Sequence, residues 1–199
     1  MTFSAAILAI VLIYTWVIDP MAPGWVTPIP AALVLGLAIW HARRHGDWGV
    51  KSAAFLPAFW QSAALTGAAA IAIYAAGRWL GTWHAPRGSW TDFWLLILWG
   101  LGQQFALHTV FLRDAQATVG RQAGIVLAAG LFAALHLPNP FLSAMTFAGA
   151  LAWCWIYDRH PNLLPLGWSH ALLTFAILSA FSEAMTGHLR VGAAYLSLR

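Results

Sequence analysis

Hydrophobic residues in this chain form long runs, which polar residues, glycine or proline separate. About seven runs approach the roughly 20 residues that a membrane-spanning helix needs. They cover approximately residues 3–18, 25–40, 56–81, 90–112, 122–137, 139–157 and 162–181. The pattern therefore predicts an all-α, polytopic helical membrane protein with about seven (six to eight) transmembrane helices in one bundle.

Residues 1–199 are expected to form a single integral membrane domain, because no shift in composition marks a boundary. The first run lacks the basic segment of a secretory signal, so we expect a retained span. The segment after Phe181 is compatible with a surface segment or with a short eighth helix. The pattern of hydrophobicity leaves both open.

Composition supports a membrane protein and excludes several other classes. The chain is 61% hydrophobic and only 8% charged, and its mean hydropathy is +0.71. A soluble domain of this size would need more polar residues to cover its core. The basic residues are spread along the loops without a stripe that could hold a nucleic-acid backbone, so we expect a lipid bilayer and no nucleic acid as partner.

Basic residues also predict an orientation in the membrane. The even-numbered loops hold Arg43, Arg44, Lys51, Arg113, Arg121 and Arg159, and the odd-numbered loops and the tail hold Arg78, Arg87, Arg190 and Arg199. Cytoplasmic loops carry an excess of lysine and arginine. We therefore expect the even-numbered loops and the amino terminus on the cytoplasmic side.

Three pairs of residues spaced four apart stand out within the apolar runs. They are Gln104 with His108, Phe132 with His136, and His170 with Thr174. This spacing places both members of a pair on one helical face. Polar side chains in a span are costly and usually face a protein interior or a cavity, where they mark a working site. Hydrogen bonding between helices, worth about 0.6–2 kcal/mol per contact, is the structural alternative for each pair.

These pairs lie in three longer motifs. They are Gln103-Gln104-Phe-Ala-Leu-His108, then Phe132-Ala-Ala-Leu-His136 followed by Leu-Pro-Asn-Pro, then His170-Ala-Leu-Leu-Thr174. In this order the chain resembles the CPBP family of intramembrane proteases, which includes the type II CAAX prenyl endopeptidases and the Abi-type proteins. That family's motifs are Glu-Glu-x-x-x-Arg, Phe-x-x-x-His and His-x-x-x-Asn. The resemblance covers about residues 95–175, within a motif-bearing core of approximately residues 90–181.

The resemblance implies a role for each motif position. Gln103 would take the place of the glutamate that activates water, and His136 would be its partner. His170 and Thr174 would hold the oxyanion. The resemblance also implies a CPBP/Abi-like helical core, and it places the protein in a bacterial inner membrane.

The substitutions in these motifs change the expected chemistry. A glutamine amide does not titrate near neutral pH, so it cannot act as a general base. Glu183 is the only glutamate of the chain, and the aspartates fall in predicted loops or at span ends. The motif arginine is replaced by His108, and the asparagine by Thr174. Acid and cation are lost together, which leaves a neutral pocket that is less costly to bury than half of an ion pair.

Three functions fit this neutral pocket. The first is a non-peptidolytic homologue, a possible pseudoenzyme, that binds a membrane-embedded peptide, lipid or membrane-protein partner. The second is an active endopeptidase in which His136 or His108 is the base. The residues that would polarise the carbonyl are Gln103, Gln104, His170 and Thr174. The third is a divalent-metal site formed by His108, His136 and His170. No other cofactor is expected.

Overall fold

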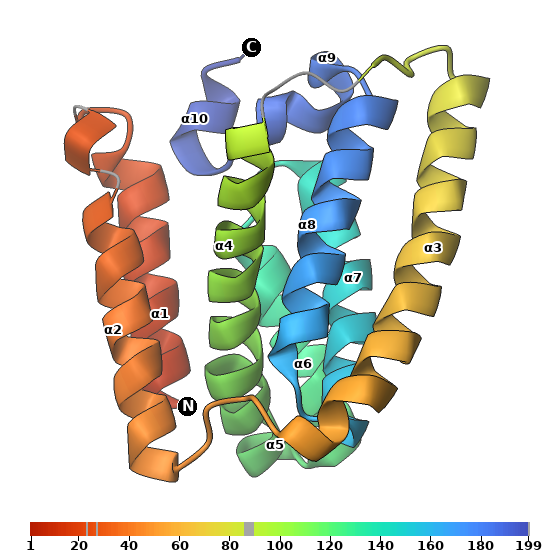
Figure 1. Ribbon diagram of the computed structural model, residues 1–199. Helices are drawn as coiled ribbons and strands as arrows, with labels where there is room; N and C mark the ends of the chain where they lie inside the picture. Colours follow the sequence, from red (N-terminus) through yellow and green to blue (C-terminus); the bar gives the residue numbers. More distant parts are fainter. Residues whose placement is uncertain (23, 27, 86–89, 199) are drawn as a thin grey trace.

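The computed structural model describes residues 1–22, 24–26, 28–85 and 90–198, and within them the protein is helical (Figure 1). The only extended pairing among these residues is an isolated antiparallel bridge between Val50 and Asn162. Helices satisfy their own backbone hydrogen bonds, which is the condition for crossing a bilayer. The protein is thus an all-α helical bundle of the membrane type, as predicted.

Across the described parts of the chain, seven helical rods run back and forth through the bundle and correspond to the seven predicted runs (Figure 1). They are α1 (Thr2–Ile13) with the π-helical turn η1 (Tyr14–Ile18), α2 (Pro28–His45), α3 (Phe55–Trp79), α4 (Trp90–Ala106) with the π-helical segment η4 (Leu107–Leu112) and α5 (Arg113–Val119), α6 (Arg121–Ala134), α7 (Pro140–Arg159) and α8 (Leu163–Ala180).

The rods differ in their capacity to span a membrane. Within the described residues, four stretches are long and apolar enough: Ser52–Trp79, Asp92–Val119, Pro140–Arg159 and Leu163–Ala180. Thr2–Ile18 and Arg121–Ala134 are apolar but shorter, and α2 has Arg43, Arg44 and His45 in its last turn. Short helices are tolerated in a membrane protein where neighbouring helices cover them. The protein is an integral membrane protein whose shortest rods depend on the bundle.

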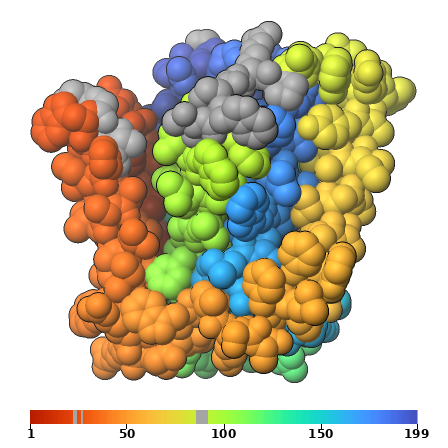
Figure 2. Space-filling view, in the orientation of Figure 1, coloured from red at the N-terminus to blue at the C-terminus, as the bar shows by residue number. Residues whose placement is uncertain are grey.

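Helix α8 is the centre of the bundle and packs closely against α3 and α4. In the space-filling view α4 and α8 lie side by side between α2 and α3 (Figure 2). A Cβ atom on Gly77 of α3 would overlap the carbonyl oxygen of Ala180, and one on Gly100 of α4 would lie 2.9 Å from the carbonyl oxygen of Gly167. Small residues permit such backbone approach between membrane helices. These contacts fix how α4 and α8 face each other.

The chain after Phe181 forms a cap over one end of the bundle. It contains α9 (Glu183–Thr186), the 3₁₀ turn η5 (Gly187–Leu189) and α10 (Gly192–Leu196), all too short to span a bilayer. The buried Asn139 side chain donates to the carbonyl oxygens of Thr186 (2.8 Å) and Arg190 (3.1 Å). Its own carbonyl oxygen accepts from the Leu142 backbone N–H at 3.0 Å. One side chain therefore caps α7 and holds the tail, which is not an eighth transmembrane helix.

The opposite end of the bundle is closed by contacts between two loops. The backbone N–H of Leu163 donates to Gly49 at 2.8 Å, and that of Lys51 donates to Pro161 at 3.0 Å. The Asn162 side chain caps α8 through Leu164 and also donates to the Lys51 carbonyl at 3.0 Å. These bonds tie the segment before α3 to the start of α8.

Candidate functional site

A hydrogen bond between α4 and α8 is the centre of the candidate site. Gln104 is 0% exposed and His170 is 8% exposed, and the Gln104 Nε2 atom lies 3.0 Å from His170 Nδ1. An amide nitrogen only donates, so Nδ1 must accept. The proton of the neutral His170 ring is consequently on Nε2. The pair presents one N–H donor on the side of the ring that faces away from Gln104.

The His170 ring is held in place by α7 and by a hydroxyl chain. The Trp153 ring stacks on it at a centroid distance of 4.8 Å and an interplanar angle of 10°. The Trp153 indole N–H donates to Ser169 Oγ at 3.0 Å, and the hydroxyls of Ser169 and Thr66 share a hydrogen bond of 2.7 Å. Stacking and hydrogen bonding together leave the imidazole little freedom to rotate.

Phe132 connects this pair to His136. The Phe132 ring lies edge-on to His170 at 6.3 Å and to His136 at 5.1 Å. His136 Nδ1 donates to the Phe132 carbonyl at 2.8 Å, because a carbonyl oxygen only accepts. His136 Nε2 is then an unprotonated acceptor in the neutral ring. The second and third motifs therefore place an acceptor nitrogen and a donor nitrogen on two sides of one phenylalanine.

His108 takes no part in this arrangement. It is 1% exposed and stacks on Tyr157 of α7 at 4.3 Å and 26°. Neither of its ring nitrogens has a hydrogen-bond partner among the described residues. The structure does not bring Gln104 and His108 together as one pair, because Gln104 meets His170 of α8 whereas His108 stacks on Tyr157 of α7.

Gln103 and Thr174 lie beside the site without joining its hydrogen bonds. Both side chains are half-buried. Within the described part of the chain, neither of them hydrogen-bonds to Gln104, His136 or His170. Gln104, and not the predicted activating position Gln103, is the glutamine that meets a motif histidine. The motif residues that the structure brings together are thus Gln104, Phe132, His136 and His170.

The three-histidine metal site is not assembled. Within the described chain, no group of three or more His, Cys, Asp or Glu side chains is arranged to hold a metal ion. His108 and His170 are each covered by a different aromatic ring of α7. A metal would need their nitrogen lone pairs to converge on one point. Within the described residues, the structure therefore does not bring His108, His136 and His170 together as one set of metal ligands.

Carboxylates lie away from the site. Most are engaged in contacts near the ends of the bundle: Asp19 with Tyr14, Asp47 with Arg113, Asp114 with Ser4, Asp158 with Arg121, and Glu183 with His188. Asp92 is in the first turn of α4. No described carboxylate contacts Gln104 or His170. The site is built from amide, imidazole and aromatic groups.

No sequence pattern indicated the aromatic half of the site. Trp153 and Tyr157 are spaced four apart on α7, and each covers one imidazole of another helix. Their spacing matches that of the polar pairs, but aromatic residues make up 14% of the chain. One more aromatic pair at helical spacing is therefore not distinctive.

Comparison with known proteins identifies the segment that carries this site. A family model described as type II CAAX prenyl endopeptidase Rce1-like matches residues 88–176. That range includes α4, α6, α7 and the first part of α8, and so all three motifs. No curated protein and no solved structure matches the chain. The resemblance seen in the motifs is therefore supported over residues 88–176, where the chain is similar to the type II CAAX prenyl endopeptidase Rce1-like family.

Proposed function

We propose that this protein is a non-peptidolytic member of the family that binds a hydrophobic partner within the membrane. The observation that carries the proposal is the Gln104–His170 pair, in which an amide fills the space beside the histidine. The pair is buried, and an amide cannot take a proton from water. A glutamate-dependent hydrolysis has no acid or base at this position.

The partner is proposed to be a membrane-embedded peptide, lipid or membrane protein. An open groove of about 640 Å³ lies between α3, α6 and α7, away from the motif histidines. Its walls are mostly apolar and include Leu65, Ile125, Val126, Leu151 and Trp155. Apolar surface of this kind suits an acyl chain or an apolar helix. The groove offers contact to a partner without bringing it to the buried site.

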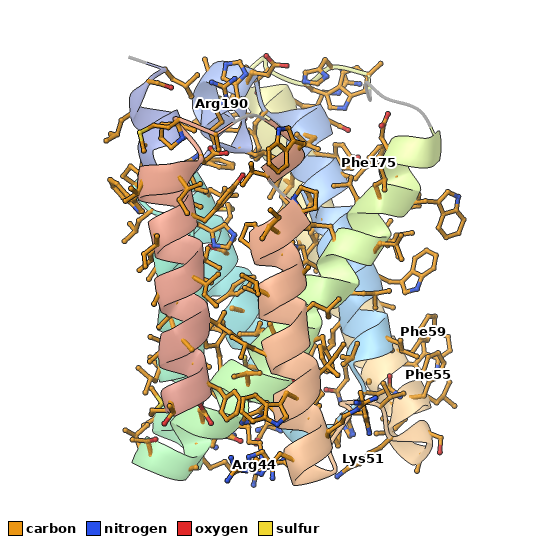
Figure 3. All side chains as sticks on the ribbon, turned by 90° about the vertical axis from the view of Figure 1, so that its left-hand side faces the viewer. Arg44, Lys51, Phe55, Phe59, Phe175 and Arg190 are labelled. Atoms are coloured by element: carbon orange, nitrogen blue, oxygen red, sulfur yellow. The ribbon has the colours of Figure 1, made fainter. Side chains whose placement is uncertain are left out.

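The orientation of the protein is part of the proposal. Arg43, Arg44, Lys51, Arg113, Arg121 and Arg159 all belong to the connections at one end of the bundle, where the amino terminus also lies. Arg44 and Lys51 are seen at this end and Arg190 at the other (Figure 3). By the excess of basic residues in cytoplasmic loops, the first end is cytoplasmic. A bacterial inner membrane is the proposed location.

A second candidate function is peptide hydrolysis with histidine as the base. The fixed tautomers favour it, because His136 Nε2 can accept a proton while His170 Nε2–H can donate to an oxyanion. Removal of a general base typically costs about 10²- to 10⁴-fold in rate. His136→Ala would therefore abolish any activity that depends on this mechanism.

A reconstitution experiment separates the two functions. Wild type, His136→Ala and Gln104→Glu are placed in proteoliposomes with fluorescent membrane-embedded and prenylated peptides, and both cleavage and retention of the peptides are measured. The proposal expects retention without cleavage by wild type and by His136→Ala. Cleavage by wild type that is lost in His136→Ala would refute it in favour of the second candidate. Absence of both cleavage and retention would contradict binding of these peptides.

The matched control for the third variant is Gln103→Glu, one residue away. Gain of cleavage in Gln104→Glu but not in Gln103→Glu would show that the scaffold still supports hydrolysis when an acid faces His170. It would also assign the acid position of the family motif to Gln104 in this chain.

A further inference from the structure

The rod of α4 and η4 packs beside α7, and we call their contact at Gln104, His108 and Tyr157 the seam. It contains polar atoms that make no hydrogen bond in the motif site. Four buried atoms there have no hydrogen-bond partner among the described residues: Gln104 Oε1, both ring nitrogens of His108, and the Tyr157 hydroxyl. Buried polar groups in folded proteins nearly always have a partner, from protein or from ordered water. A cluster of four such atoms on adjacent helices indicates a bound partner.

Two neighbouring rods carry the four atoms: the rod of α4 and η4 carries Gln104 and His108, and α7 carries Tyr157. Gln104 is at the inner end of the seam, beside His170. His108 is four residues further along the same rod, a rise of about 6 Å, and its ring stacks on Tyr157. A water molecule that bridges two groups spans a distance of this size, since it lies about 2.8 Å from each. The spacing therefore fits a short series of bridging molecules.

The outer end of the seam reaches the charged loops. Asp47 accepts from the Gly49 backbone N–H at 3.1 Å and from Arg113 at 3.2 Å. A Cβ atom on Gly49 would lie 3.2 Å from the Tyr157 hydroxyl. The Gly49 backbone thus covers the seam where it approaches the polar end of the bundle.

The chemistry of the four atoms selects the ligand. A neutral imidazole has one donor and one acceptor, the tyrosine hydroxyl can do both, and the amide oxygen only accepts. This mixed, uncharged set suits neither an anion nor a metal cation. Water has two donors and two acceptors, and buried waters typically make about three hydrogen bonds to groups of this kind.

We propose that the seam of Gln104, His108 and Tyr157 is a binding site for internal water that leads from the charged loop of Asp47 to the Gln104–His170 pair. The inference goes beyond partner binding and does not depend on it. The π-helical segment is part of the site, because it carries His108, whose ring stacks on Tyr157 of α7. Helical segments of this type are frequent at functional sites.

X-ray radiolytic labelling of the reconstituted full chain in H₂¹⁸O tests the proposal, since hydroxyl radicals formed from bound water oxidise adjacent side chains. Each labelling rate is divided by the rate of the same residue in the unfolded chain. Phe111 is the internal control, because it belongs to η4 and is 0% exposed. Tyr157 is expected to be labelled several-fold faster than Phe111, although both are buried. Equal labelling of Tyr157 and Phe111 would overturn the proposal.

Two variants identify the source of the label. His108→Phe keeps an aromatic ring against Tyr157 but removes both nitrogens, so labelling of Tyr157 is expected to fall several-fold. Thr109→Val is the matched control, because its hydroxyl bonds only to the Phe105 carbonyl of its own helix, and labelling is expected to persist. Undiminished labelling of Tyr157 in His108→Phe would overturn the shared site. If His108→Phe does not fold, the wild-type comparison of Tyr157 with Phe111 decides.

Discussion

Gly100→Ala tests whether the contact between α4 and α8 sets the geometry of the site. The added Cβ atom would lie 2.9 Å from the Gly167 carbonyl oxygen and 3.5 Å from both Ala171 N and His170 Cβ. Main-chain atoms in a helix cannot rotate out of the way, so α4 must move away from α8. Gly100 is four residues before Gln104 on the same helix. The movement therefore stretches the 3.0 Å hydrogen bond to His170.

The size of the effect follows from two opposing terms. Overpacking of a filled contact costs about 1–3 kcal/mol, and replacing glycine by alanine inside a helix returns about 0.5–1 kcal/mol. We expect Gly100→Ala to lower the free energy of unfolding by about 0.5–2 kcal/mol. Gly102→Ala is the matched control on the same helix, because no atom lies within 4 Å of its added Cβ. It should leave stability unchanged or raise it by up to about 1 kcal/mol.

Both variants are measured by denaturant unfolding in lipid bicelles, with ¹⁵N NMR of the His170 ring as a local readout. Gly100→Ala should also shift the Nδ1 resonance, since its hydrogen bond is weakened, whereas Gly102→Ala should not. Two outcomes would refute the idea that the contact between Gly100 and Gly167 sets the geometry of the site. One is equal stability of the two variants, and the other is a stabilised Gly100→Ala with an unchanged Nδ1 resonance.

Two further substitutions test single side chains. Gln104→Leu leaves His170 Nδ1 buried without a donor and should lower the free energy of unfolding in bicelles by about 1–3 kcal/mol, whereas Thr174→Val should change it little; similar losses in both would contradict the inferred pair. Asn139→Ala removes three hydrogen bonds of about 1 kcal/mol each and should expose the tail after Phe181 to limited proteolysis. A tail that stays as resistant as in wild type would mean that the Gly192–Leu137 backbone hydrogen bond of 2.8 Å and the packing of α10 on η1 are enough to hold it.

Hydrophobic pattern and motif spacing predicted the seven rods and the residues from which the site is built. Their limits were close to those observed, because a bilayer imposes a length on every apolar run. The pattern did not distinguish Gln103 from Gln104. Adjacent residues point about 100° apart around a helix, so the choice depends on how α4 is rotated. The contact of Gly100 with Gly167 fixes that rotation.

Spacing was also insufficient for Gln104 and His108. Four-residue spacing places two residues near one face of a helix, but it does not say which neighbouring side chain each of them meets. The partner of His108 is Tyr157, which is 49 residues away in the sequence. A partner so distant does not follow from a local pattern.

The sequence by itself determined that the protein is a helical membrane protein, that residues 88–176 resemble one family, and that the motif site has no carboxylate. Those properties depend on residue type and on order along one helix. Only the tertiary structure decided which polar residues meet, because rotation and crossing of helices bring Gln104 to His170 and leave His108 against Tyr157. Close glycine contacts set these rotations, and they are properties of pairs of helices.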